Sequence, residues 1–187
     1  EVEETIEAST FGNVIHKVLE ELYKPLLNKI LIPEDIEGLK KKLDEELEAQ
    51  FKEIYSDHYD TGKNYLFFHA AKKNILAFLT QEKKLVKDNE VIIVGLEKKA
   101  EKAFPVEING KTIQAKLKGT IDRIDRINGE LRVIDYKTGV VNANELELKD
   151  LEKIISDTNK SKAFQLMFYG LLMEDELKEN ERFTSGI

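Results

Sequence analysis

The chain has 187 residues, of which 41% are hydrophobic and 35% charged, and 36 acidic against 29 basic side chains give a net charge of −7 at pH 7. Because both signs of charge are interspersed, this composition predicts a globular fold with an ordinary core. Cysteine is absent, which excludes disulfides, thiol catalysis and zinc fingers. Any metal ion must therefore be held by oxygen or imidazole ligands.

Segments for targeting or membrane insertion are not found in the sequence. The apolar runs are too short to span a bilayer, and the acidic start Glu1–Glu7 does not resemble a signal peptide. We therefore expect a cytoplasmic protein with no membrane partner. The acidic total argues only weakly against nucleic-acid binding, because a local lysine stripe can coexist with carboxylates that gather cations.

The first half of the chain has helical periodicity. Three amphipathic helices are predicted, at about Phe11 to Tyr23, Pro33 to Tyr55 and Tyr65 to Val86. Ser9 or Thr10 is the expected cap of the first helix, and Pro25 ends it. A polar loop is expected from Ser56 to Asn64.

Beyond residue 90 the period changes to that of strands. Two Asn-Gly pairs, at Asn109-Gly110 and Asn128-Gly129, favour type I′ hairpin turns between alternating segments. They predict strands at about 91–108, 111–127 and 130–137. Helices return, weakly near Leu148–Ile155 and strongly from about Ala163 to Leu177, and Phe183–Ile187 can begin another strand.

These elements predict one α/β domain over residues 1–187, with a central mixed sheet that has helices on both faces. Its parts are a helical region at about 9–88, an antiparallel three-strand meander at 90–139 and C-terminal helices at 145–180. The chain starts without Met and stops soon after a helical segment. We expect a piece of a longer protein, with a truncated C-terminus.

The second Asn-Gly turn places two carboxylates side by side. In a symmetric turn at residues 128 and 129 the numbers of cross-strand partners add up to 257, which makes Asp122 and Asp135 direct neighbours. Like charges there are destabilising unless a cation lies between them. Lys137, two residues beyond Asp135, falls on the same face. The alternative is a slipped register or a bulge that turns one Asp into solvent.

The same pairing arithmetic predicts two further cross-strand pairs. It pairs Asp125 with Arg132, which we interpret as an ordinary cross-strand salt bridge. For the first turn the numbers add up to 219, which brings Glu97 beside Asp122. Pro105 and the length of the strand favour a bulge there, so Glu97 is either a third metal ligand or a solvent-exposed strand residue.

At this point the residues resemble the PD-(D/E)XK nuclease superfamily, specifically its RecB/AddB-type nuclease domain. Gly119–Asp125 and Val133–Gly139 contain the two acids and the lysine of that family. Gly12 with His16 matches its Gly-x-x-x-His motif, and Gln165 with Tyr169 matches its Gln-x-x-x-Tyr motif. Four motifs in family order cover nearly the whole chain.

The resemblance implies a restriction-endonuclease-like core and a role for each matched position. Asp122 and Asp135 resemble the metal-binding acids, and Lys137 resembles the catalytic lysine. His16 resembles an additional metal ligand, and the backbone carbonyl of Tyr136 a further one. Gln165 and Tyr169 resemble a pair that lines the site and contacts DNA. Hard oxygen ligands suit one or two Mg²⁺ or Mn²⁺ ions.

Less specific interpretations apply to several residues. His16 taken alone, or Gln165 and Tyr169 taken alone, are typical of ordinary helix positions. His58 is interpreted as a surface-loop residue, and His69 has no predicted partner. The Gly110-Lys111-Thr112 sequence resembles the tail of a phosphate-binding loop, but Pro105 stands where that motif needs glycine.

By resemblance the predicted function is Mg²⁺- or Mn²⁺-dependent hydrolysis of DNA, exonucleolytic and within recombination or repair. A helicase region of the same protein or of a partner subunit is the expected partner. Some relatives carry a four-cysteine iron–sulfur cluster, which these residues cannot form. A cluster-free branch is expected, and the alternative is that the cysteines lie outside this piece of the protein. The alternatives are an inactive nuclease-like scaffold that binds DNA or protein, and an unrelated α/β domain.

Overall fold

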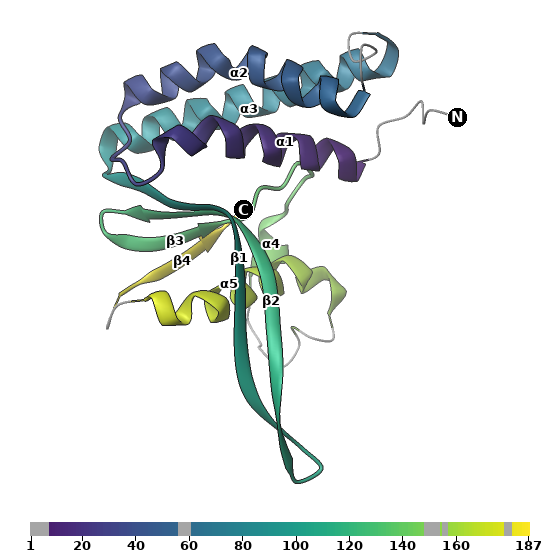
Figure 1. Cartoon of the computed structure of the whole chain (residues 1–187), viewed down its shortest axis with the longest axis vertical. Coiled ribbons are helices and arrows are strands. Elements are labelled where there is room, and N and C mark those ends of the chain that lie inside the picture. The colour runs from purple at the N-terminus through teal and green to yellow at the C-terminus, as the bar shows by residue number, and fades with distance from the viewer. Residues whose placement is uncertain (1–7, 56–60, 148–153, 155–156, 178–180) are drawn as a thin grey trace. The chain divides into compact units, whose positions relative to one another are not determined.

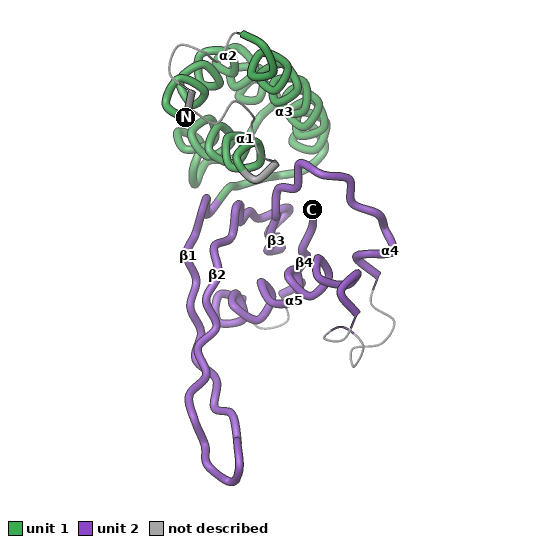
Figure 2. The backbone as a smooth tube through the Cα atoms, turned by 90° about the vertical axis from the view of Figure 1, so that its right-hand side faces the viewer, with its two compact units in different colours: residues 1–93 green, residues 94–187 purple. Residues whose placement is uncertain are grey.

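The computed structural model describes residues 8–55, 61–147, 154, 157–177 and 181–187. The chain forms two compact units, which comprise residues 1–93 and 94–187 (Figure 2). Among the described residues, no helix combines the length and the apolar character needed to cross a membrane.

The first unit is a bundle of three helices. Its elements are α1 (Ala8–Tyr23), the short 3-10 helix η1 (Lys24–Leu26), α2 (Pro33–Tyr55) and α3 (Gly62–Asp88). The apolar positions spaced three and four apart on α2 are all buried, as their periodicity predicts: Ile36, Leu39, Leu43, Leu47 and Phe51. On α3 the buried stripe includes Ile75 and Leu79, whereas Lys72 pairs with Asp44 at 2.6 Å.

Two predicted helix boundaries are wrong. α1 begins at Ala8, so Ser9 and Thr10 lie inside the helix instead of preceding it. α3 begins at Gly62, which takes the last part of the predicted loop into the helix. Pro25 does end α1, because it lies in the η1 turn that follows.

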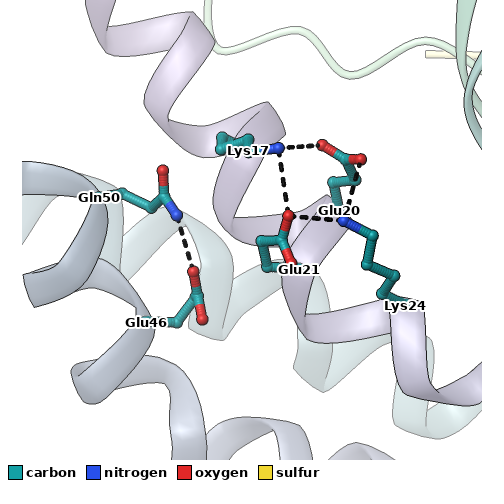
Figure 3. Close-up of polar contacts among 6 residues, drawn as sticks. All are labelled: Lys17, Glu20, Glu21, Lys24, Glu46 and Gln50. Carbon is teal, nitrogen blue, oxygen red and sulfur yellow. Dashed lines mark hydrogen bonds and ion pairs between the residues drawn. The ribbon is translucent and has the colours of Figure 1, made fainter. Parts of the chain in front are cut away.

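Charged side chains one turn apart stabilise the exposed side of α1. Lys17 contacts Glu20 at 2.8 Å and Glu21 at 3.1 Å, and Lys24 contacts Glu21 at 2.8 Å (Figure 3). The hydrogen bonds of Lys17, first that to Glu20 and then that to Glu21, raise its pKa. Pairs at this spacing support helical structure, here in the segment next to His16.

The second unit contains nearly all of a four-stranded mixed sheet in the order β1-β2-β3-β4 (Figure 1). The strands are β1 (Val91–Ile108), β2 (Lys111–Ile127), β3 (Glu130–Ile134) and β4 (Phe183–Gly186). Its helical elements are α4 (Ala143–Leu146), η3 (Thr158–Lys160), α5 (Ser161–Met173) and η4 (Glu174–Glu176). The predicted α/β class with a mixed sheet is confirmed.

Both predicted turns are present. Asn109 and Gly110 have φ of 51° and 72°, and Asn128 and Gly129 have φ of 52° and 87°. Positive φ at both central residues is the requirement of the type I′ turn that the sequence favours. The register from Arg123↔Ile134 to Ile127↔Glu130 is the one predicted.

The third strand is shorter than the predicted 130–137, because β3 ends at Ile134. Beyond it the backbone leaves β2: the Asp135 N–H donates to the Gly186 carbonyl at 3.0 Å, and the Tyr136 N–H donates to Asp122 Oδ2 at 2.6 Å. The C-terminal segment does form a strand, β4, which runs parallel to β3. Asp135 and Lys137 therefore follow the strand instead of lying within it.

Helix α5 packs on this sheet through a shared core. The core includes Ile121, Ile124 and Val133 from the strands and Leu166 and Leu172 from the helix. The predicted helix of residues 163–177 is observed as α5 followed by η4, and most of the weak prediction at 148–155 falls outside the described residues. This packing places the polar side of α5 beside the end of β3.

Candidate active site

Two buried carboxylates lie beside the end of β3, Asp122 within β2 and Asp135 directly after β3. Asp122 and Asp135 are 7% and 2% exposed, and Asp122 lies within a run of β2 that is buried on both faces from Ile121 to Asp125. Burying a carboxylate is costly unless hydrogen bonds or cations compensate for lost water. Asp122 receives one such bond from the Tyr136 N–H, noted above, so the turn of the chain after β3 stabilises the acid on β2.

Asp135 is held by a different set of groups. Its Oδ1 accepts hydrogen bonds from Gln165 Nε2 at 2.9 Å and from the Tyr169 hydroxyl at 3.2 Å. Its Oδ2 forms an ion pair with Lys137 Nζ at 2.5 Å. The structure thus brings Asp135, Lys137, Gln165 and Tyr169 into one cluster.

Gln165 and Tyr169 lie one turn apart on α5, as predicted. Gln165 Nε2 also donates to the Tyr169 hydroxyl oxygen at 2.7 Å, which links the two side chains. Burial, and after it the charge of Asp135, raises the pKa of Tyr169. The hydroxyl therefore stays protonated and acts as a donor to Asp135.

Glu97 approaches Asp122 from β1. Carboxylate oxygens of the two residues lie within 4.8 Å of each other. The backbone of Glu97 has φ of 44°, a left-handed conformation that is rare for a residue in a strand and marks a local irregularity of the kind expected there. Glu97 is half-buried, which disagrees with its interpretation as a solvent-exposed strand residue.

The chemistry of these donors fits a hard divalent cation. Glu97 and Asp122 offer carboxylate oxygens at close range, where two negative charges repel each other without a counter-charge. Asp135 Oδ2 is buried and accepts no hydrogen bond from the described residues beyond its ion pair with Lys137. Oxygen ligands of this type suit Mg²⁺ or Mn²⁺.

The three histidines differ in position. His16 lies on α1 in the first unit and is half-buried. His58 falls outside the described residues. His69 lies on α3 and contacts the ring of Tyr65 with centroids 4.2 Å apart, so aromatic packing accounts for it.

β2 and β3 also carry a charged cluster that sequence reasoning predicted in part. Arg132 donates to both oxygens of Asp125, at 2.8 and 2.7 Å, which confirms the predicted cross-strand salt bridge. Arg123 was not predicted: it is fully buried and contacts Asp125 Oδ2 at 2.8 Å. Its position two residues before Asp125, on the same strand face, is the signal that could have indicated it.

A mixed α/β sheet with buried acids and a lysine beyond its third strand is the arrangement of a metal-dependent phosphodiesterase. The chain matches the family model described as the PD-(D/E)XK nuclease superfamily over residues 1–186, and it belongs to that superfamily. A comparison with curated proteins returned no match. Membership confirms the predicted superfamily and fold class, and it assigns the chain to the metal-dependent nucleases.

Proposed function

We propose that this chain is a metal-dependent DNA nuclease whose active centre contains Asp122, Asp135 and Lys137. The observation that carries the proposal is the contact between Lys137 Nζ and the buried carboxylate of Asp135 at 2.5 Å, beside a second buried acid on β2. A buried acid with a lysine two residues away is difficult to explain as a stabilising feature alone. In a nuclease site the acid would hold a metal ion, and the lysine would add positive charge beside the phosphate.

The metal ligands proposed are Asp122, Asp135, Glu97, the carbonyl of Tyr136 and His16. The proximity of Glu97 to Asp122 supports the first part of this set. His16 and the carbonyl rest on the family motif. One or two bound Mg²⁺ or Mn²⁺ ions would lower the pKa of water and neutralise charge on the scissile phosphate.

Lys137 has the exposure that a catalytic lysine needs. Its side chain is 30% exposed, whereas that of Asp135 is 3% exposed. The ammonium group can therefore contact Asp135 on one side and a phosphate oxygen of DNA on the other. We assign to Lys137 the orientation of the attacking water and the stabilisation of the negative charge that develops on the phosphate.

Gln165 and Tyr169 position Asp135 in this proposal. Tyr169 is 5% exposed, and its hydroxyl is occupied by Asp135 and Gln165, so its support of the carboxylate is direct. Gln165 is half-buried and can also contact DNA, the role that the motif implies. Partners of this kind orient a ligand carboxylate and tune its affinity for metal.

The finer assignment rests on the four motifs in their order along the chain. They favour a RecB/AddB-type exonuclease without an iron–sulfur cluster, acting in cytoplasmic DNA recombination or repair. A helicase, in the same protein or in a partner subunit, would deliver the DNA end. The alternative is an inactive scaffold that binds DNA or protein, and the presence of both acids together with Lys137 disfavours it.

End-labelled single- and double-stranded DNA, incubated with the protein in Mg²⁺, Mn²⁺ or EDTA, tests this proposal. We expect cleavage with either metal ion and none in EDTA, with labelled products that distinguish exonuclease from endonuclease action. Metal binding is measured separately by thermal unfolding. Mn²⁺ at about 100 times its Kd should stabilise the protein by about 2.7 kcal/mol. Stabilisation without cleavage by the protein in its full-length context would favour the scaffold.

A further inference from the structure

β1 and β2 continue beyond α5 as a two-stranded ribbon, which we define as residues 98–118. Figures 1 and 2 show it projecting away from the helix and the other two strands of the sheet. Every residue from 105 to 114 is exposed. The ribbon is far longer than the pairing with β3 requires, since β3 has only 5 residues.

The ribbon is basic although the chain is acidic. It contains six lysines and two glutamates, in a chain with a net charge of −7. The lysines are Lys98, Lys99, Lys102, Lys111, Lys116 and Lys118. Local positive charge of this kind attracts a polyanion even when the total charge of a protein is negative.

The lysines fall into two groups according to their contacts. At the base of the ribbon, Lys102 contacts Glu174 and Asp175 of η4, each at 2.8 Å, and Lys98 pairs with Glu176. These ion pairs attach the ribbon to the end of α5. The other four lysines of the ribbon therefore supply the positive charge that it presents to solvent.

Lys116 and Lys118 present that charge to solvent. Their side chains are 62% and 67% exposed, and both contact the carboxylate of Glu101, at 3.2 and 2.9 Å. The two ammonium groups, first that of Lys118, lower the pKa of Glu101. Exposed ion pairs contribute little to stability, so a phosphate can replace Glu101 at low cost. Lys99 and Lys111 are exposed as well.

We infer that the ribbon of residues 98–118 is a second DNA contact, an arm whose exposed lysines bind the phosphate backbone beside the nuclease centre. This inference rests on the proposed function, because DNA is the partner. A two-stranded β-ribbon fits the major groove of a duplex, and the exposed lysines along it, with Lys111 at its tip, are positioned to reach the flanking phosphates. Lys111 lies 11 residues before Asp122 on β2. At about 3.3 Å per residue, the tip would contact DNA about ten base pairs from the site of cleavage.

The arm is tested with fluorescence anisotropy on a labelled 25-base-pair duplex, in EDTA so that no cleavage occurs. The variant K111Q/K116Q/K118Q should bind about tenfold more weakly than the parent at low salt, and each lost phosphate contact should reduce the salt slope by about 0.9. Glu101→Gln should change affinity in the opposite direction, because it removes the carboxylate that competes with phosphate for Lys116 and Lys118.

The matched control is K41Q/K42Q/K84Q, which removes three exposed lysines from the helical unit. It should change the DNA affinity less than twofold. Equal weakening by both triple variants would overturn the inference, because it would show only an effect of total charge. An unchanged affinity of the ribbon variant would also overturn it and would point to a protein-docking role.

Cleavage of an 8-base-pair duplex, too short to reach the ribbon tip, separates this inference from the proposed function. Lys111→Gln, which changes only the lysine at the tip, should cleave it at the rate of the parent and should cleave the 25-base-pair duplex more slowly. If the protein in its full-length context cleaves neither DNA, the proposed function fails, and the anisotropy comparison still decides whether the ribbon binds DNA.

Discussion

Asp135 receives three contacts, which have two different consequences. Lys137 neutralises its charge, whereas Gln165 and Tyr169 fix the direction of its carboxylate. The family motif alone suggests that the pair on α5 contacts DNA. The low exposure of Tyr169 indicates a positioning residue, whose loss should act through the acid.

Removal of the Tyr169 hydroxyl tests that role. Tyr169→Phe keeps the ring in the core but removes one donor to Asp135, so we expect about a tenfold loss of activity or of metal affinity. The metal concentration needed for half-maximal cleavage should rise, while DNA affinity measured in EDTA should not change. Phe168→Leu, a change to the adjacent core residue, is the control. Loss of DNA affinity in Tyr169→Phe would instead support a direct DNA contact.

The buried cluster of Arg123, Asp125 and Arg132 has no assigned role in catalysis and should act on stability. Asp125→Ala leaves Arg123 buried without its carboxylate, and we expect the free energy of unfolding to fall by about 3 kcal/mol. Urea denaturation measures this change. Glu107→Ala, at an exposed position of β1, should change it by less than about 0.5 kcal/mol. A loss below about 1 kcal/mol in Asp125→Ala would contradict this role of the cluster.

At the scale of the elements, the turns determine the site. The register of β2 and β3 could be predicted because Asn128-Gly129 leaves few ways to pair the strands. That register is the basis for expecting Asp122 beside Asp135. The end of β3 could not be predicted. It depends on β4, about 50 residues later, and on the hydrogen bond of Tyr136 N–H to the side chain of Asp122.

Gly129 is the residue that this turn requires most strictly. Its φ is 87° and no atom lies within 4 Å of the site where a Cβ would be added, so only the backbone resists substitution. Gly129→Ala should lower the free energy of unfolding by about 1 kcal/mol. Gly38→Ala, in α2 with equally open surroundings, should raise it by about 0.5 kcal/mol. Equal effects of the two changes in urea denaturation would contradict the role given to the turn.

At the scale of the whole molecule, the composition predicted little of the charge distribution, whereas the spacing of apolar residues predicted most of the helices and strands. The net charge of −7 does not reveal the basic ribbon, because its lysines are offset by acids elsewhere in the sequence. Helices α2 and α3 followed from apolar spacing, and most of the sheet followed from alternation and turns. The family motif predicted that Gln165 and Tyr169 line the site, but not their hydrogen bonds to Asp135, which join residues 30 and 34 positions apart and follow from no local rule.

The most direct test of the central claim is the rate of DNA cleavage by Lys137→Ala with Mg²⁺ or Mn²⁺. Lys137 is partly exposed, so its loss should leave the fold intact, as unchanged circular dichroism and thermal unfolding would show. We predict a fall in the cleavage rate of at least about a hundredfold, since the variant loses the charge that stabilises the transition state. Lys84→Ala, an exposed lysine on α3, should cleave at the parent rate. A Lys137→Ala variant as active as the parent would contradict the assignment of Asp122, Asp135 and Lys137 as the nuclease centre.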